Sequence, residues 1–504
     1  MMTRTSLAAP LAGFLILGSL ACAQPRVATS RIAGSPFTTA IDSVAARLFA
    51  LNASPGVGIV VVRDTQVVYV KGFGYADVEA KRPFTAETEF YIASTTKSFT
   101  GLAVAMLDRQ GVLKLDEPIS RYLPAAKLRP PLNADSITVR SLLTHTHGIG
   151  GGPVAIRLAY TGEYEGDAEL TRLLAEHSPN PSGRAYSYTN LGYNIVGLAM
   201  DDVNHESWKE TLRRLLFTPL GMTHTSAYVS GRSQDRLAMP YVTTPEGFAR
   251  TRYGKTDANM QSAGGLITTP VDMGRWLEAQ INDGRLDGKQ VLPATAVAET
   301  HKILVPVAGG ARGLHSLGYG LGWQISLLGD DTLVHHGGGF AGFATHMSFM
   351  PQHRVGIAVM ANNSELGAPL AELMATAIYD VVRGRPAITA DSVAAIGRHL
   401  VRMRGQLAAS IAQRAKRPQD LPFPLDAYTG RFYNPVLGHL ELRMVNGKLE
   451  AQMGAAWSAI EVYDNTKNQL RVELFGGGEV ITVGVKDGRA DSVLFEGLTF
   501  SRVP

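Results

Sequence analysis

Phe90-Tyr91-Ile92-Ala93-Ser94-Thr95-Thr96-Lys97-Ser98-Phe99-Thr100 leads straight into an apolar segment, Gly101 to Leu107, and is the most informative run of this chain. Ser94 and Lys97 are three residues apart, so on a helix their side chains share one face, with Cβ atoms about 5–6 Å apart. A serine hydroxyl needs a base within hydrogen-bonding reach to act as a nucleophile. A lysine desolvated by the apolar segment would have a lowered pKa and could be that base. A helix N-cap serine followed by a solvated lysine would have the same spacing.

The composition is that of an ordinary globular protein. Of 504 residues, 45% are hydrophobic and 18% charged, which is enough for a large core and more than one domain. The formal net charge is +4 without any dense tract of lysine and arginine. The sequence therefore gives no indication of nucleic-acid binding.

The N-terminus has the marks of a secretory signal peptide over residues 1–23. Arg4 precedes an apolar run from Leu7 to Leu20, and Ala21-Cys22-Ala23 supplies a small-residue cleavage site. The run is too short for a comfortable membrane span. Cleavage after Ala23 would remove the only cysteine, so we expect an exported protein, periplasmic or secreted, without disulfides. Lipid attachment at Cys22 ranks second, because the three residues before it match the usual lipobox poorly.

Two regions far apart in the sequence have strand patterns that we expect to share one antiparallel sheet. Residues 57–62 and 67–73 form a hairpin pattern after a helical segment at 37–51. Strand patterns return at 320–325, 332–336, 345–350 and 355–360. The helical region between them would be an inserted subdomain. The predicted fold class is therefore α+β, with helices flanking the sheet.

The C-terminal part has a different pattern. Residues 386–424 are basic and Ala-rich and end in a Pro-rich stretch, which indicates a helix followed by a linker. Beyond them, short strand patterns alternate with turn signals such as Asn446-Gly447 and Asp487-Gly488. These features predict a small β-barrel or β-sandwich over residues 425–504, after a main domain over residues 37–385.

Three further stretches bear on chemistry. In Tyr188-Thr189-Asn190 a phenol could shuttle a proton and an amide could orient a carbonyl, although both residue types are common in loops. In His335-His336-Gly337-Gly338-Gly339 the glycines would let a substrate lie along a strand edge, and a backbone N–H could join that of Ser94 in an oxyanion hole. A Gly-rich turn is the plain alternative for that stretch. The apolar half of Leu142-Leu143-Thr144-His145-Thr146-His147-Gly148 indicates packing rather than catalysis.

Taken in this order, the stretches resemble the serine β-lactamase-like family, which includes class C β-lactamases, D-Ala-D-Ala carboxypeptidases, D-aminopeptidases and β-lactamase-fold esterases. The resemblance covers residues 37–385. Ser94-Thr95-Thr96-Lys97 and Tyr188-Thr189-Asn190 match its first two motifs, and His336-Gly337-Gly338 stands where members carry K-T-G or H-x-G. Residues 142–148 and 264–272 also match characteristic stretches. The resemblance implies a β-lactamase-like sheet, no cofactor, and a small-molecule ester, amide or D-amino-acid peptide as substrate.

The resemblance also implies a role for each site residue. Ser94 would be the nucleophile and Lys97 its base, while Tyr188 would relay a proton to the leaving group or activate the deacylating water. Asn190 would contact the substrate, and His336, Gly338 and Gly339 would lie beside it. The Ser94 and Gly339 N–H groups would form the oxyanion hole. How Lys97 and Tyr188 share the base role stays open.

Departures from the family pattern concern the substrate. The lysine and threonine of K-T-G typically hold a carboxylate, whereas His336 is largely neutral at pH 7 and Gly337 has no hydroxyl. We therefore expect an esterase or D-amino-acid peptidase with weak β-lactamase activity at most. The alternatives are a true class C-type β-lactamase or D-Ala-D-Ala carboxypeptidase, and a non-catalytic protein that binds cell-wall fragments or a partner. We expect no metal site, because neither histidine pair has zinc-protease spacing.

Overall fold

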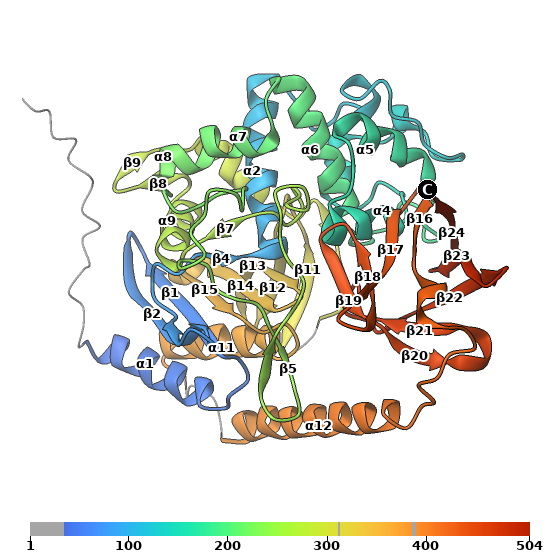
Figure 1. Ribbon diagram of the computed structural model, residues 1–504. Coiled ribbons are helices and arrows are strands. Elements are labelled where there is room, and N and C mark those ends of the chain that lie inside the picture. The colour runs from blue at the N-terminus through green and yellow to red at the C-terminus, as the bar shows by residue number, and fades with distance from the viewer. Residues whose placement is uncertain (1–34, 311–312, 386–389) are drawn as a thin grey trace, which may run out of the picture. The chain divides into compact units, whose positions relative to one another are not determined.

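The computed structural model describes residues 35–310, 313–385 and 390–504 (Figure 1). The predicted signal peptide, residues 1–23 with Cys22, lies outside the described residues. Across those three ranges, no helix has both the length and the apolar character needed to cross a lipid bilayer.

The described chain begins with the predicted helix and hairpin. Ser35 caps α1 (Pro36–Phe49) by accepting a hydrogen bond from the Thr38 N–H at 3.2 Å. β1 (Gly56–Arg63) and β2 (Gln66–Asp77) follow and pair antiparallel. The predicted helix and hairpin are therefore confirmed.

The central sheet has nine antiparallel strands in the order β10-β11-β12-β13-β14-β15-β1-β2-β3 (Figure 1). The late strands join the early hairpin where β1 pairs with β15, with Val57 opposite Ala361. The prediction that the two regions share a sheet is therefore confirmed. The remaining strands are β3 (Arg82–Pro83), β10 (Val305–Pro306), β11 (Leu314–Tyr319), β12 (Gln324–Leu328), β13 (Asp331–Phe340), β14 (Phe343–Met350) and β15 (Val355–Ala361).

β1 lies inside the sheet and is buried on both faces, because helices cover each side. Ile59 and Val61 pack in the cluster that includes residues of α1 and α11 (Gly367–Val382). Val60 and Val62 pack in the cluster that includes α2 (Thr96–Gln110) and α9 (Pro270–Ile281). Burial on two faces explains why β1 is apolar throughout instead of alternating.

One predicted strand is wrong. The pattern predicts a strand over residues 320–325, but β11 ends at Tyr319, β12 begins at Gln324, and a turn joins them. Gly322 in this turn has a φ of 82°, and a Cβ there would lie 2.3 Å from the Lys97 carbonyl oxygen. Close packing of the turn against α2 therefore decides the structure of this stretch, rather than strand propensity.

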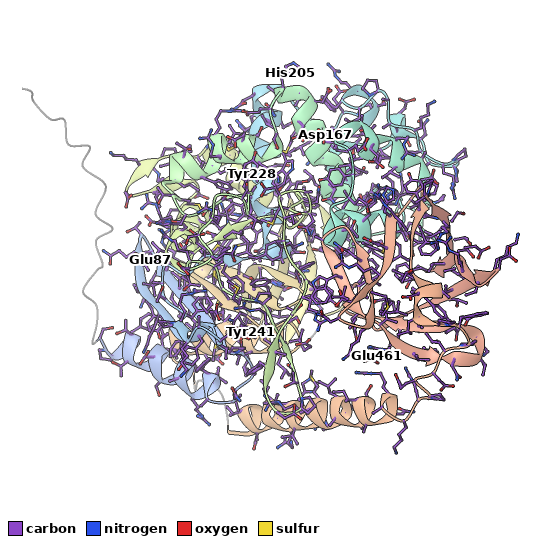
Figure 2. The ribbon with its side chains drawn as sticks, viewed as in Figure 1. Glu87, Asp167, His205, Tyr228, Tyr241 and Glu461 are labelled. Carbon is purple, nitrogen blue, oxygen red and sulfur yellow. The ribbon has the colours of Figure 1, made fainter. Side chains whose placement is uncertain are left out.

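The part between the hairpin and the late strands is mainly helical. Besides α2 and α9, its helices are α3 (Val139–Leu143), α4 (Pro153–Ile156), α5 (Asp167–Leu173), α6 (Leu191–Asn204), α7 (Trp208–Leu212), α8 (Thr218–Leu220) and α10 (Ala294–Thr300). Short ribbons pair β4 (Phe90–Tyr91) with β7 (Ile267–Thr268), β5 (Tyr241–Thr243) with β6 (Phe248–Arg250), and β8 (Arg285–Leu286) with β9 (Lys289–Gln290). Figure 2 shows Tyr241 on β5, whose hydroxyl accepts a hydrogen bond from the Val78 N–H at 2.7 Å and so ties this ribbon to the end of β2.

The C-terminal part contains the predicted helix, α12 (Ala390–Arg414), and a second antiparallel sheet of nine strands. The strand order is β19-β18-β17-β16-β24-β23-β22-β21-β20, and the sheet forms a nearly closed barrel. Its strands are β16 (Gly430–Asn434), β17 (Gly438–Val445), β18 (Lys448–Met453), β19 (Ala456–Ala459), β20 (Glu461–Asp464), β21 (Gln469–Val472), β22 (Glu479–Lys486), β23 (Arg489–Phe495) and β24 (Leu498–Val503). β16 and β24, the first and last of these strands along the chain, pair with each other.

Three histidines are buried on the neighbouring strands β13 and β14. His335, His336 and His346 are each at most 7% exposed. Burial lowers the pKa of His335 to about 4 and the pKa values of His336 and His346 to about 3. The folded chain therefore keeps all three rings neutral at pH values where an unfolded chain would protonate them.

We expect the fold to lose stability as the pH falls from about 7 towards 4. The unfolded chain binds protons below its histidine pKa of about 6.5, and the folded chain does not, so the stability is complete above that pH and declines below it. Each histidine held neutral should account for about 2 kcal/mol of the loss at pH 5. Thermal unfolding at pH 7.5 and 5 measures the loss, which should be smaller in His346→Gln. An equal loss in the variant and the wild type would contradict this account.

Candidate active site

Ser94 lies in a 3₁₀ turn, η1 (Ala93–Thr95), that continues directly into α2. Ala93 has a φ of 49°, a left-handed conformation that non-glycine residues rarely adopt, so the backbone before the serine is held in an unfavourable state. Ser94 is partly exposed, whereas the residues from Thr95 to Leu107 are buried. The fold therefore presents this hydroxyl at the accessible end of a buried helix.

Lys97 is fully buried and meets the Ser94 hydroxyl. Its Nζ lies 3.2 Å from Ser94 Oγ, 2.7 Å from Asn190 Oδ1 and 2.8 Å from the Ala263 carbonyl oxygen. Lys97 forms no ion pair with a carboxylate of the described chain. Because nothing offsets the loss of hydration, desolvation lowers the pKa of Lys97 well below its ordinary value.

Tyr188 and Asn190 reach this pair from the loop before α6. The Tyr188 ring centroid lies 4.9 Å from Lys97 Nζ, which itself lies 3.2 Å from Ser94 Oγ, so the phenol belongs to the same cluster. Tyr188 is 42% exposed, so its ring forms part of the open wall of the site. Desolvation raises the pKa of the phenol above its ordinary value, which keeps it protonated at neutral pH. Asn190, predicted to contact substrate, also accepts a hydrogen bond from Lys97.

The glycines of β13 lie against η1 in a way that the sequence did not reveal. A Cβ on Gly338 would lie 2.3 Å from the Ile92 carbonyl oxygen and 3.2 Å from the Ser94 nitrogen, so only glycine fits there. A Cβ on Gly337 would have its nearest neighbour at 3.9 Å, and one on Gly339 would have none within 4 Å. Gly338 therefore makes room for the backbone of the nucleophile, whereas Gly337 and Gly339 leave open space.

His336, next to these glycines, is buried and uncharged. Its Nδ1 lies 2.6 Å from the Gly337 carbonyl oxygen and its Nε2 lies 3.2 Å from the Tyr319 hydroxyl. Since a carbonyl can only accept, the proton of the neutral ring is on Nδ1. Burial lowers the pKa of His336 to about 3. This position of β13 therefore supplies no positive charge at neutral pH.

Sequence reasoning missed two contributors to the site. Ala263 acts through its backbone carbonyl, which no residue type signals. His145 lies in the stretch that we interpreted as packing, yet its ring centroid is 4.5 Å from that of Tyr188. Its Nδ1 also accepts a hydrogen bond from the Thr189 N–H at 3.3 Å. The polar residues of that stretch, Thr144 to His147, were the signal in the sequence that could have indicated this role.

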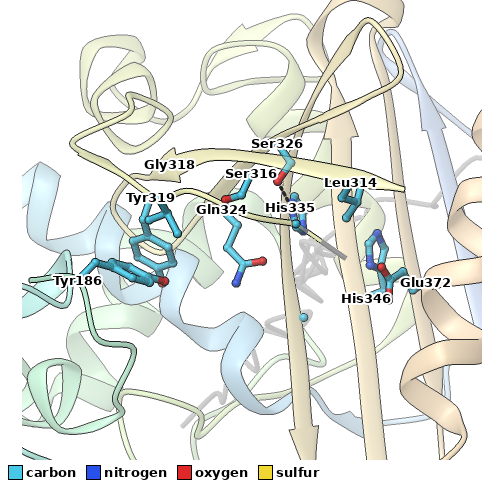
Figure 3. A pocket seen from close by; sticks show the side chains of 13 residues that line it. Tyr186, Leu314, Ser316, Gly318, Tyr319, Gln324, Ser326, His335, His346 and Glu372 are labelled. Atoms are coloured by element: carbon cyan, nitrogen blue, oxygen red, sulfur yellow. Dashed lines mark hydrogen bonds between the residues drawn. The ribbon is translucent and has the colours of Figure 1, made fainter. Parts of the chain in front are cut away.

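A cavity of about 260 Å³ adjoins the site at Tyr319 and Gly337 (Figure 3). It runs from Tyr186 and Tyr319 to His346 and Glu372, and at its centre Ser326 Oγ lies 2.9 Å from His335 Nε2. The cavity offers room beside β13 for a part of a ligand that extends beyond the reacting bond. Among the described residues, no three His, Cys, Asp or Glu side chains are grouped so that they could hold a metal ion.

The family model described as Beta-lactamase matches residues 42–380. Protein flp from Staphylococcus aureus (strain N315) is 29% identical over 333 residues, which make up 65% of this chain and 63% of that protein. The chain therefore spans slightly less than two thirds of the length of the curated relatives that it matches.

Two solved structures are similar to this one. The octameric penicillin-binding protein homologue from Pyrococcus abyssi has a TM-score of 0.57 and 23% identity, over 91% of this chain and 98% of that one. The D-amino acid amidase from Ochrobactrum anthropi SV3 has a TM-score of 0.59 and 21% identity, over 69% of this chain and 99% of that one. These likenesses show the fold, and the family model spans all the residues gathered around Ser94. The chain therefore belongs to the Beta-lactamase family, a family of serine hydrolases.

Proposed function

We propose that this protein is an exported serine hydrolase that forms an acyl-enzyme on Ser94 and hydrolyses an ester or an amide. The observation that carries the proposal is the contact of 3.2 Å between Ser94 Oγ and a lysine whose pKa is strongly lowered. Export rests on the signal-peptide pattern of residues 1–23 alone.

The surroundings of Lys97 favour it as the base for acylation. A neutral amine has two N–H bonds, and two acceptors lie at 2.7 and 2.8 Å, namely Asn190 Oδ1 and the Ala263 carbonyl oxygen. With both N–H bonds so directed, the lone pair is left for the hydroxyl proton of Ser94. As that proton moves to Lys97, the oxygen of Ser94 bonds to the substrate carbonyl carbon.

Tyr188 suits the second half of the reaction. Its phenol is protonated, and its ring lies 4.9 Å from the amine that contacts Ser94, so it can give a proton to the leaving group when the tetrahedral intermediate collapses. Lys97, then charged, can return its proton to Tyr188. A water molecule would attack the acyl-enzyme by the reverse use of the same groups and release Ser94. The N–H groups of Ser94 and Gly339 would hold the developing oxyanion, since β13 passes close to Ser94 at Gly338.

The uncharged His336 favours substrates that bring no carboxylate to β13. Esters and D-amino-acid amides or peptides fit this condition better than β-lactams. A structural neighbour bears the name D-amino acid amidase, which supports an amide of this kind as a candidate substrate. A class C-type β-lactamase or D-Ala-D-Ala carboxypeptidase stays the alternative, and the cephalosporin comparison below separates the two.

Ser94→Ala should abolish both turnover and covalent labelling by a fluorophosphonate, because the variant has no nucleophile. Ser98→Ala is the matched control, since Ser98 is buried one turn away and donates to the Thr95 carbonyl oxygen at 2.9 Å. Peptide mapping of the labelled protein identifies the modified residue. Label retained by Ser94→Ala, or found on another residue, would refute the assignment. If the wild type shows neither turnover nor labelling, that result would favour a non-catalytic binding protein.

Tyr188→Phe should lower kcat most for substrates whose leaving group must be protonated. A p-nitrophenolate leaves without a proton, whereas an anilide must receive one, so the anilide rate should fall by about 100-fold or more and the ester rate by much less. Steady-state kcat values on the two substrates measure the difference. Equal losses on both would remove Tyr188 from the proton-relay role.

Blocking the carboxylate of a chromogenic cephalosporin as an ester should change kcat/KM by less than about threefold. An enzyme that holds the carboxylate with a cation would lose about 1.5–3 kcal/mol, roughly 10- to 150-fold. Parallel assays of the free acid, its ester and p-nitrophenyl butyrate make the comparison. A large preference for the free acid would instead support the β-lactamase alternative.

A further inference from the structure

His145 adopts an unusual backbone conformation in the interior of the protein. Its φ is 60°, and its side chain is 1% exposed. Such a conformation is uncommon for residues other than glycine, although His, Asn and Asp adopt it more often than most, and here the surrounding contacts hold it. Strain of this kind often accompanies a functional constraint.

The backbone and the side chain of His145 each accept a hydrogen bond from the segment that carries Tyr188. Its carbonyl oxygen accepts the Ser187 N–H at 2.9 Å, and its Nδ1 accepts the Thr189 N–H at 3.3 Å. The residues on either side of Tyr188 are therefore bonded to one and the same residue. The His145 ring also packs 4.5 Å from the Tyr188 ring and 4.8 Å from the Tyr319 ring, centroid to centroid.

The residue after this segment, Asn190, is joined to α2, since its Oδ1 accepts a hydrogen bond from Lys97 at 2.7 Å. Tyr188 lies in an irregular loop and is 42% exposed, and its ring also packs 6.5 Å from that of Tyr319 and 6.0 Å from that of His336. The Leu191 N–H bonds back to Thr189 Oγ1, which shapes the loop internally without connecting it to α3. The two bonds that His145 accepts connect this loop to the residues that follow α3.

The His145 ring stays neutral, which its hydrogen bond to the Thr189 N–H requires. Desolvation lowers the pKa of His145 well below its ordinary value, so Nδ1 stays an acceptor. The proton of the neutral ring is then on Nε2, which is buried and has no hydrogen-bond partner in the described chain.

We propose that His145 is a positioning residue that fixes the backbone of residues 187–189 and thereby holds the Tyr188 ring beside the amine of Lys97. This inference rests on the proposed function, because it assigns His145 a part in the proton relay of the same site. It does not make His145 a proton donor or acceptor in the reaction.

His147 provides a matched control two residues further on. It is also 1% exposed, its Nδ1 accepts the Ile149 N–H at 3.0 Å, and its Nε2 has no partner in the described part of the chain. It has neither the positive φ of His145 nor a ring contact with Tyr188. If the buried histidines of this stretch only stabilise the fold, substitutions of His145 and of His147 should have similar effects.

The test compares His145→Asn with His145→Gly, since both residues tolerate a positive φ but only asparagine offers an acceptor near the place of Nδ1. We expect the glycine variant to lose about 100-fold in kcat on an anilide with little change in KM, as displaced catalytic groups typically do. His145→Asn should keep kcat within about fivefold and His147→Asn within about threefold of the wild type. His145→Ala replaces the glycine variant if that variant does not fold.

A double-mutant cycle with Tyr188→Phe completes the test. If His145 acts through the Tyr188 phenol, His145→Gly should cost less than about threefold once that phenol is gone. Undiminished loss in the Tyr188→Phe background, or equal kcat in His145→Gly and His145→Asn, would overturn the proposal. Wild-type protein without turnover or labelling at Ser94 would count against the proposed function instead.

Discussion

The burial of Lys97 without a carboxylate partner is the constraint on which the site depends. An amine placed in the interior loses its hydration, and with no opposing charge its neutral form is favoured. The two acceptors that direct its N–H bonds, Asn190 and Ala263, lie 93 and 166 residues away along the chain. A base for Ser94 therefore exists only when α2, the loop before α6 and the segment before β7 are held together.

Several close backbone contacts hold these pieces together. Thr100 on α2 donates to the Ser262 carbonyl oxygen at 2.8 Å, and Ser262 Oγ donates to the Tyr193 carbonyl oxygen on α6 at 3.0 Å. On β13, Gly338 lets the strand approach the Ser94 nitrogen, and Gly322 lets the β11–β12 turn approach the Lys97 carbonyl oxygen. Glycine is needed at both positions because a Cβ would overlap main-chain atoms. The positions of the nucleophile and its base are thus fixed by main-chain packing as well as by side chains.

Much of this could be predicted from the sequence, and what was missed has identifiable causes. The pairing of Ser94 with Lys97 depends on local helical spacing, and the hairpin and late strands on patterns a few residues long, so both could be predicted. The turn at Gly322 was assigned to a strand because its partner, Lys97, is remote in sequence. Ala263 contributes a main-chain oxygen, and His145 acts on residues more than 40 positions away, so local patterns indicated neither role. The roles of Tyr188 and Asn190 came from the family resemblance, not from spacing.

An NMR titration of lysine side chains labelled with ¹³C at Cε tests the central claim most directly. One resonance, absent from Lys97→Met, should have the chemical shift of an uncharged amine at about pH 7.5, while ordinary lysines remain charged up to about pH 10.4. Such a resonance would establish that the amine beside Ser94 is neutral before any substrate arrives. A Lys97 resonance that titrates together with the surface lysines would show a charged side chain there, and the proposed base would not exist.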